Sequence, residues 1–268
     1  QREHYHIPHM HHIRGNAYRE IGDFEASIRD HREGIAISAD IWPDDDYRRG
    51  TAWHSLGTTL VASGRFEEAT DAFDKALANA EIAEGGARRI PTIRYWQGLI
   101  AYRNGDLETA DSLYSEAAEV IDVMRGFAPL MLKSARGSLW MDRKAFDQAR
   151  PYVEEIIALD DGFAHLPAFA AATAFYRETG ELEKSLQVGE RIETVIAATG
   201  EPLSWRSALA LGEYGLTLAA CGRAVAEGVL MNAVSGATSV LDIKDARVVR
   251  FIDPKVPDDL SAGVGCGQ

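Results

Sequence analysis

The sequence repeats one pattern along most of its length, and this repetition constrains the fold more than any other feature. The clearest copy covers residues 50–84, where Gly57 lies ahead of a turn at Gly64 and Phe73 lies beyond it. A regular period predicts a stack of similar units, because each unit buries its apolar side against its neighbours rather than around one central core. The equivalent turn positions, 36 to 42 residues apart, are Gly22, Gly64, Gly105, Lys144, Gly180 and Gly222.

Within each copy, apolar residues recur at intervals of three and four, which is the period of a helix with one buried side. We therefore predict an all-α fold in which each copy forms two antiparallel helices, giving about six helix pairs with almost no strand. Residues 1–241 are predicted to form this stack, and residues 242–268 a C-terminal cap and irregular tail. The approximate bounds of the pairs are 8–42, 50–86, 91–125, 130–162, 166–200 and 208–241.

Short residue signals mark the expected helix ends. Glycine at the turn positions permits a backbone conformation that other residues avoid, and Gly57 is expected to let the two helix backbones of its pair approach closely. The acidic segments 43–46 and 160–162 are expected to cap the helices that follow, because a carboxylate accepts from the free N–H groups of a first turn. Prolines expected in the first turns of first helices are Pro8, Pro91, Pro129 and Pro167.

The clearest copy resembles the tetratricopeptide repeat signature, and Leu60 departs from it where tyrosine is usual. The resemblance implies a right-handed α–α superhelix, or solenoid, whose first helices line a concave groove that binds an extended peptide or a partner helix. The copies exceed the family's usual unit of about 34 residues. In this they are similar to the helical repeat regions of large bacterial signalling regulators and of peptide-sensing regulators. The matching residues are Trp53, Leu56, Gly57, Ala69 and Phe73.

The resemblance also implies which residues face the groove. Asn16 alone is similar to the arrangement with which some members hold a C-terminal carboxylate, so a chaperone tail is not the expected ligand. Tyr95 and Tyr102 are seven residues apart, share one helix face and are expected to dominate partner affinity. The alternative is that both tyrosines pack into the core. The projected groove residues are His12, Asn16, His54, Thr58, Tyr95, Leu99, Tyr102, Ser134, Ser138 and Arg177, with Ala170 and Ala174.

Composition limits the partners that we expect. The formal net charge is -13 without a compensating run of lysine or arginine, so no nucleic acid partner is expected. No apolar stretch approaches the roughly 18 residues of a membrane-spanning helix, so no membrane partner is expected. The two cysteines, Cys221 and Cys266, lack metal or redox spacing, which favours a cytoplasmic location without a disulfide framework. The oligomeric state and the partner's identity stay open.

Five of the chain's eight histidines lie near the N-terminus. Imidazole is a metal ligand, so they could supply part of a metal site, but no carboxylate or cysteine lies at ligand spacing beside them. The alternative is a solvated or groove-lining surface. Cys221 has no general base near it in sequence, and the chain contains no nucleophile elbow, zinc-protease helix or phosphate-binding loop. The five histidines are His4, His6, His9, His11 and His12.

Together these features predict a protein–protein interaction module or scaffold with no catalytic residues, no metal and no cofactor. Its ligand is expected to be a protein or peptide held in the groove, and the module is expected to belong to a larger bacterial regulator. Two alternatives stay open. One is a peptide-sensing solenoid that changes curvature when its ligand binds. The other is a metal-dependent enzyme that uses the N-terminal histidine cluster.

Overall fold

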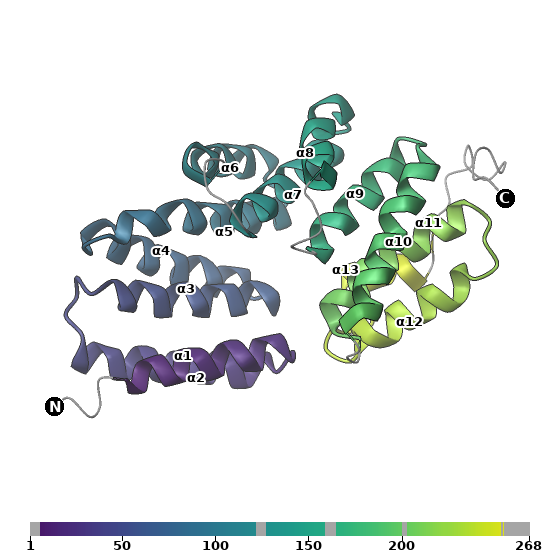
Figure 1. Cartoon of the computed structure of the whole chain (residues 1–268). Coiled ribbons are helices and arrows are strands. Elements are labelled where there is room, and N and C mark those ends of the chain that lie inside the picture. The colour runs from purple at the N-terminus through teal and green to yellow at the C-terminus, as the bar shows by residue number, and fades with distance from the viewer. Residues whose placement is uncertain (1–5, 122–126, 159–164, 200–202, 253, 255–268) are drawn as a thin grey trace. The chain divides into compact units, whose positions relative to one another are not determined.

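The computed structural model describes residues 6–121, 127–158, 165–199, 203–252 and 254 of the chain. Over these residues the chain forms 13 α-helices, one short 3-10 helix and no strand (Figure 1). Helices α1 to α12 form six consecutive pairs, and α13 follows them. The prediction of an all-α fold of about six helix pairs is therefore confirmed.

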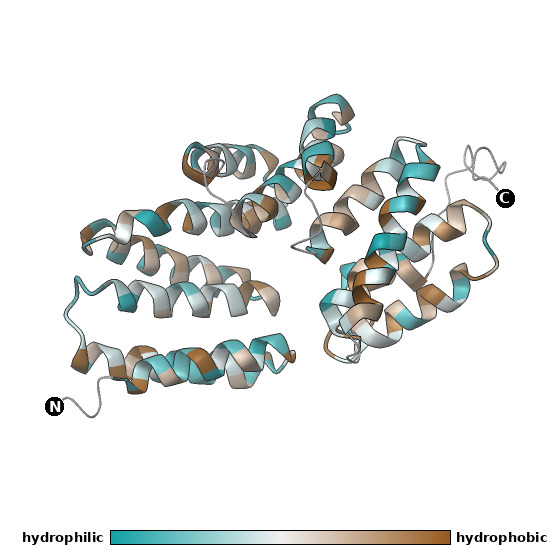
Figure 2. Cartoon of the chain, in the orientation of Figure 1, coloured by the Kyte–Doolittle hydropathy of each residue, from teal (hydrophilic) through white to brown (hydrophobic). Residues whose placement is uncertain are grey.

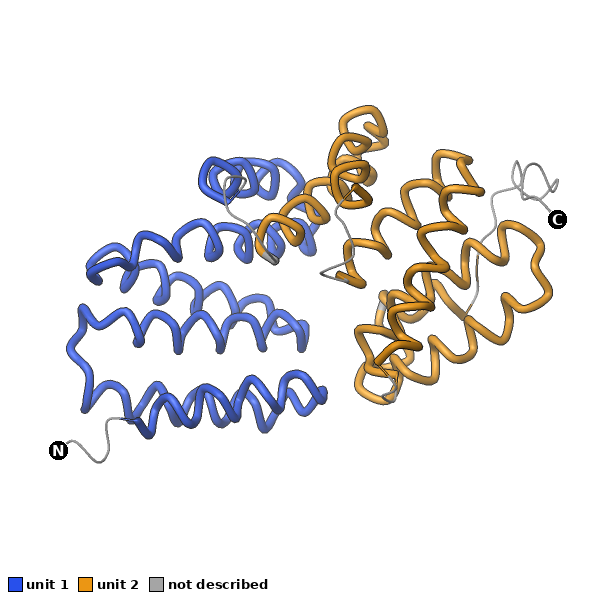
Figure 3. The backbone as a smooth tube through the Cα atoms, viewed as in Figure 1, with its two compact units in different colours: residues 1–124 blue, residues 125–268 orange. Residues whose placement is uncertain are grey.

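The helices fall into two compact units, residues 1–124 and 125–268 (Figure 3). In unit 1 the two helices of each pair pack on each other, and α2 packs on α3 as α4 packs on α5. Each helix thus buries its apolar side against a neighbour in the stack. The elements of unit 1 are α1 (Ile7–Glu20), α2 (Phe24–Ile41), α3 (Tyr47–Ala62), α4 (Phe66–Ile82), the 3-10 helix η1 (Gly86–Arg89), α5 (Ile90–Arg103) and α6 (Leu107–Ile121).

Unit 2 repeats this arrangement with three further pairs, in which α9 also contacts the first helices α7 and α11. The part of the predicted tail beyond residue 254 lies outside the described residues. The elements of unit 2 are α7 (Phe127–Asp142), α8 (Phe146–Ala158), α9 (Leu166–Glu178), α10 (Leu182–Thr199), α11 (Trp205–Ala220), α12 (Ala226–Thr238) and α13 (Ala246–Ile252).

All six predicted turn positions have a left-handed backbone. Their φ angles lie between 57° at Lys144 and 84° at Gly22. Each turn is closed by the same backbone hydrogen bond, donated by the residue after the turn position to a carbonyl five residues earlier. In the first pair this bond joins the Asp23 N–H to the Tyr18 carbonyl at 2.9 Å, and in the fourth it joins the Ala145 N–H to the Trp140 carbonyl at 2.9 Å. The first helix of each of the six pairs therefore ends in the same kind of turn.

Helix starts also agree with the residue signals. Proline occupies the first turn of α1, α5 and α9, where the missing N–H has no helical partner in any case. Asp46 caps α3, because its side chain accepts a hydrogen bond of 3.0 Å from the Arg48 N–H. The prediction for residues 160–162 lies outside the described residues.

A large side chain from the second helix packs onto a small residue of the first. Phe73 is 0% exposed, and a Cβ added at Gly57 would lie 2.7 Å from its Cζ atom. Gly57 therefore makes room for the ring rather than for a backbone, which corrects the predicted role of this glycine. Added Cβ atoms would also meet second-helix side chains at Gly15 (His31, 2.6 Å), Gly98 (Tyr114, 2.8 Å) and Gly215 (Leu230, 2.8 Å).

Helix α13 packs against α11 and α12 in unit 2. Its residues Val248 and Phe251 are buried, and a Cβ added at Gly212 would lie 2.4 Å from the Phe251 ring. The stack of unit 2 is thus covered by a helix of seven residues. Hydrophilic and hydrophobic residues mix along the helices of both units (Figure 2). None of the described helices is long and apolar enough to cross a membrane.

Lys144→Gly should stabilise the protein by about 0.5–1 kcal/mol. A left-handed conformation costs a residue with a side chain roughly 1–2 kcal/mol, and glycine loses part of that gain through its greater freedom in the unfolded chain. The lysine side chain makes an exposed contact of 3.3 Å with Glu178, and its Nζ atom lies 5.8 Å from the centre of the Phe146 ring. Urea unfolding measures the change. As the matched control, Gly180→Ala should lower stability, and a less stable Lys144→Gly variant would contradict this account of the turn.

Candidate functional site

One ring from each first helix of unit 1 lies over a ring from the helix that follows it. The first-helix ring stands three residues before the packing glycine in all three pairs. The rings therefore occupy equivalent positions, and the first pair differs from the others in having two imidazoles. The ring centroids are 5.9 Å apart in His12–His31, 5.6 Å in His54–Phe73 and 6.0 Å in Tyr95–Tyr114.

Four of the predicted groove residues are brought together by α1 and α3. On α1 the Nδ2 atom of Asn16 lies 3.2 Å from the Nε2 atom of His12. Between the helices, Nη1 of Arg19 donates a hydrogen bond of 2.6 Å to the Thr58 hydroxyl. Arg19 lies seven residues after His12 and so shares its helix face. The projection onto the sequence missed Arg19, although this spacing was a signal that could have found it.

The sequence did not indicate a second arginine whose charge acts on His54. The positive charges of Arg89 and Arg19 both act on the His54 ring. Arg89 is the last residue of η1, and its guanidinium carbon lies 5.7 Å from the centre of the Tyr47 ring. Burial lowers the pKa of Arg89, and among the described residues it has no carboxylate partner. Repeat periodicity could not place Arg89, because η1 belongs to the connection between two pairs.

We name the following residues the histidine–arginine cluster: His12, Asn16, Arg19, His31, His54, Thr58 and Arg89. Burial, followed by neighbouring positive charge, lowers the pKa values of His12 and His31 to about 4 and that of His54 to about 3. The three rings are therefore neutral at pH 7. His31 is 2% exposed, and neither of its ring nitrogens has a hydrogen-bond partner among the described residues. An unpaired buried polar group costs about 1–3 kcal/mol of folding free energy, so the unpaired atoms of the cluster destabilise the folded state.

The remaining predicted groove residues of unit 1 lie on α5. Tyr95 is 7% exposed, and its ring contacts Trp96 at 5.2 Å and Tyr114 at 6.0 Å. Burial raises the pKa of Tyr95. The alternative that this tyrosine packs into the core is therefore favoured over its predicted role as an exposed anchor. Leu99 and Tyr102 are half-buried.

In unit 2 the predicted groove residues have other surroundings. Ser134 and Ser138 are half-buried on α7. Arg177 donates to the carboxylate of Glu213 at 2.8 Å and to its backbone carbonyl at 3.0 Å. Glu213 is 3% exposed and also pairs with Arg250 at 2.6 Å. Arg177 is thus neutralised inside the unit, which corrects its projection as a groove residue. Ala170 is half-buried, as is Ala174.

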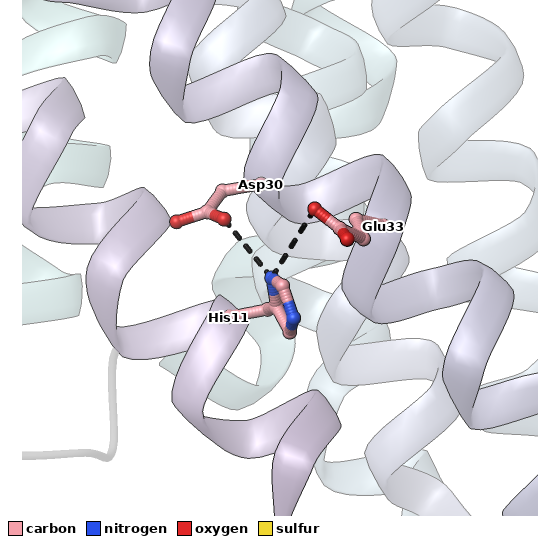
Figure 4. Close-up of side chains that lie close together, drawn as sticks. All are labelled: His11, Asp30 and Glu33. Atoms are coloured by element: carbon pink, nitrogen blue, oxygen red, sulfur yellow. Dashed lines mark hydrogen bonds and ion pairs between the residues drawn. The ribbon is translucent and has the colours of Figure 1, made fainter.

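His11 meets two carboxylates from α2 (Figure 4). Its Nδ1 atom lies 2.9 Å from Asp30 and 3.9 Å from Glu33. These three groups have donor atoms within 4.8 Å of one another, as metal ligands would. Arg14, however, donates from Nε to Asp30 at 2.5 Å and bonds its second oxygen as well, and this hydrogen bonding lowers the pKa of Asp30. A cation would have to displace a guanidinium, so we assign the group to pairing α1 with α2.

The predicted histidine metal site is not assembled as the sequence suggested. His9 and His12 stack with ring centroids 6.1 Å apart, while the carboxylates beside His11 come from another helix. The prediction for His4 lies outside the described residues. Cys221, in the turn after α11, is half-buried. The expectation that the cysteines form no disulfide framework involves Cys266, which lies outside the described residues.

Comparison with known families and sequences agrees with the repeat architecture. Two tetratricopeptide repeat models match the chain, one over residues 7–82 and the other over residues 54–122. The kinesin light chain-related protein 3 of Arabidopsis thaliana is 32% identical over 103 residues, which cover 36% of this chain and 15% of the plant protein. The chain thus matches a small part of that relative's length.

Solved structures show the same fold. The repeats of a putative kinesin light chain from Podosopora anserina superpose with a TM-score of 0.56 at 15% identity, covering 74% of this chain and 98% of the other. BtubC from P. vanneervenii gives 0.58 at 19% identity, covering 74% and 86%. The Cut9–Hcn1 hetero-tetramer of the APC/C gives 0.61 at 11% identity, covering 92% and 43%. At these identities the likeness concerns the fold, and the predicted resemblance is confirmed.

His31→Phe should make the protein less sensitive to acid. The pKa of His31 is lowered to about 4 in the fold, so the unfolded chain binds the proton first and stability is lost as the pH falls from about 6.5 towards 4. By pH 5 this ring should have cost about 2 kcal/mol relative to pH 7. Phenylalanine does not titrate, and Phe73 shows that its ring fits the equivalent position.

Urea unfolding at pH 7 and pH 5 tests this expectation. The loss of stability between the two pH values should shrink in His31→Phe by about 2 kcal/mol. His9→Phe is the matched control, because His9 is an exposed residue of α1. If both variants lose as much stability as the unmodified protein, His31 does not titrate as its burial implies.

Proposed function

Because this chain is a tetratricopeptide repeat protein, we propose that it holds a segment of a partner protein against the first helices of unit 1. The repeats make the chain a protein–protein interaction module. The first helices α1, α3 and α5 carry six of the projected groove residues that support this proposal. Leu99 and Tyr102 are half-buried on α5, and the other four belong to the histidine–arginine cluster: His12, Asn16, His54 and Thr58.

The observation that carries this proposal is the histidine–arginine cluster. Side chains from α1, α2, α3 and η1 converge there, and several of their polar atoms have no partner among the described residues. Protein interiors normally pair such buried atoms, so their unpaired state marks these helices as the part of unit 1 to test for a ligand. Unit 2 lacks this feature at Arg177, since Glu213 satisfies that guanidinium from within.

The proposal extends to the setting of the module. The net charge of -13 supports a protein partner over nucleic acid, whose phosphates it would repel. Lengthened units support a place within a larger bacterial regulator. A cytoplasmic location is part of the same proposal.

Replacing Leu99 and Tyr102 together by alanine should weaken partner binding by about 2 kcal/mol or more, close to thirtyfold, as for other interface hot spots. Both side chains are half-buried on α5, so the melting temperature should fall by no more than a few degrees. Proteins retained from a lysate of the source organism by the unmodified chain identify the partner, and titration of that partner measures affinity.

The matched control is Thr70→Ala with Asp71→Ala, since both residues are exposed on the second helix α4. This variant should bind the partner as the unmodified chain does. If the α4 variant loses the partner and the α5 variant keeps it, the partner uses the second helices and the proposal is wrong.

A further inference from the structure

We propose that the outer face of α1 docks an amphipathic helix of a partner protein, in the way that each of α2 and α4 packs on the first helix of the next pair. The face carries a row of exposed residues, Met10, Ile13 and Ala17, which we name the end stripe. Arg19 of the groove lies nine residues, about two and a half helical turns, after Met10. The end stripe therefore lies on the side of α1 opposite Arg19, and this site is separate from the groove of the proposed function.

The end stripe corresponds to positions that are covered on the next two first helices. Counted from the left-handed turns, Met10 is equivalent to Ala52 of α3 and Ile93 of α5. Met10 is 66% exposed, whereas Ala52 is buried and Ile93 is 0% exposed. Helix α2 packs on α3 and helix α4 packs on α5, so the same face of α1 is the one that a second helix would cover. The other counterparts are Ser55 and Trp96 for Ile13, and Thr59 and Ile100 for Ala17.

The apolar contact between α4 and α5 shows what a docked helix would provide. Phe73 of α4 stacks on Trp96 of α5 with ring centroids 6.2 Å apart, and both belong to one apolar cluster with Ile93. On α1 the position of Trp96 is occupied by Ile13, which is exposed. A large apolar side chain of a docked helix would bury this residue, and burial of apolar area is the main favourable term in association.

A polar contact between the same two helices also has its counterpart on α1. Nε2 of Gln97 donates a hydrogen bond of 2.9 Å to the Asp74 carboxylate of α4. Arg14 occupies the position of Gln97 and is exposed. Its bonds to Asp30 use Nε and Nη2, and a guanidinium has five N–H donors in all, so donors remain for a second acceptor. An acidic residue at the place of Asp74 therefore matches α1.

The surface beside the end stripe is hollowed and apolar. A cavity of about 390 Å³ lies there, and Ile21, four residues after Ala17, extends the exposed apolar row beyond the last turn of α1. Contiguous exposed apolar patches mark interaction sites, and an apolar hollow accepts the anchoring side chain of an amphipathic helix. The residues that line the cavity are Ile7, Met10, His11, Ile13 and Arg14.

A helix of another protein suits this face better than a second copy of the chain. Arg14 lies on the same face as Met10 and Ala17, between them in the sequence. A symmetric contact between two α1 helices would bring the two Arg14 guanidinium groups together, and like charges repel. A partner helix with an acidic residue beside its apolar row would instead pair with this arginine.

A synthetic copy of α4 tests the proposal, because α4 is the helix that packs on α5. The peptide spans residues 66–82 with acetylated and amidated ends, and a side-chain lactam between Asp71 and Lys75 holds it helical. Both linked residues are exposed and lie on the side of α4 opposite Phe73. A control peptide with the same lactam carries Phe73→Ser and Asp74→Ser. Circular dichroism verifies that both peptides are helical, and fluorescence anisotropy measures their binding to the full chain.

We expect the α4 peptide to bind at least tenfold more tightly than the control peptide. Replacing Met10 and Ile13 together by lysine should weaken this binding at least tenfold and leave the melting temperature unchanged, because both side chains are exposed. The matched control is Met231→Lys on α12, where the methionine is 67% exposed, and it should change binding less than twofold. The double alanine variant of Leu99 and Tyr102 should bind the peptide normally, which separates this site from the groove.

Equal binding of the two peptides, no binding of either, or binding that survives substitution of Met10 and Ile13 would overturn the proposal. Sedimentation of the chain alone tests the second copy as occupant, and we expect a contact-free α1 face in solution. If the chain instead forms a dimer that the Met10 and Ile13 substitutions dissociate, the face joins two copies and the proposal is wrong.

Discussion

The structure depends on one packing contact, the insertion of a second-helix side chain over a small residue of the first helix. The contacts of Phe73 with Gly57 and of Tyr114 with Gly98 hold the two helices of a pair close together and fix their positions along each other's length. The same contact places the residue three positions before the glycine directly beside the inserted ring, as His54 lies beside Phe73. In the first pair the inserted ring and the ring beside it are both histidines, His31 and His12. The contact that forms part of the apolar core in the other pairs therefore forms part of the candidate site in the first pair.

In each unit, a buried hydrogen bond between a serine and a threonine also joins two neighbouring pairs. Ser27 and Thr59 share a buried hydrogen bond of 3.0 Å in unit 1, and Ser185 and Thr217 share one of 2.8 Å in unit 2. An arginine from the preceding first helix reaches the same place in both units. It is Arg19 in unit 1 and Arg177 in unit 2, and only Arg177 meets a buried carboxylate. Arg19 therefore pairs with the half-exposed Glu20 at 3.2 Å, whereas Arg177 is paired with a carboxylate buried inside unit 2.

Local features of the fold could be predicted from the sequence, and features that depend on distant residues could not. The six left-handed turns follow from residue type and period alone, and even Lys144 lies where the period puts it. The family resemblance predicts that His12 and Asn16 share one face, and their side chains lie 3.2 Å apart. Arg177 was misplaced because its partner Glu213 lies 36 residues away. The sequence could not decide between an exposed and a buried Tyr95, because its shielding by Trp96 and Tyr114 depends on how neighbouring helices pack.

The recurring turn has a consequence for how such a chain can change during evolution. Each pair is closed by backbone hydrogen bonds between residues on either side of the turn, such as Arg65 and Leu60, and these bonds need no particular side chain. The turns are separated by 36 to 42 residues, so differences in unit length lie in the helices and connections between one turn and the next. A duplication or deletion of one helical turn in those parts leaves every closure unchanged. Repeat length can therefore drift without selection acting on the geometry of the pairs.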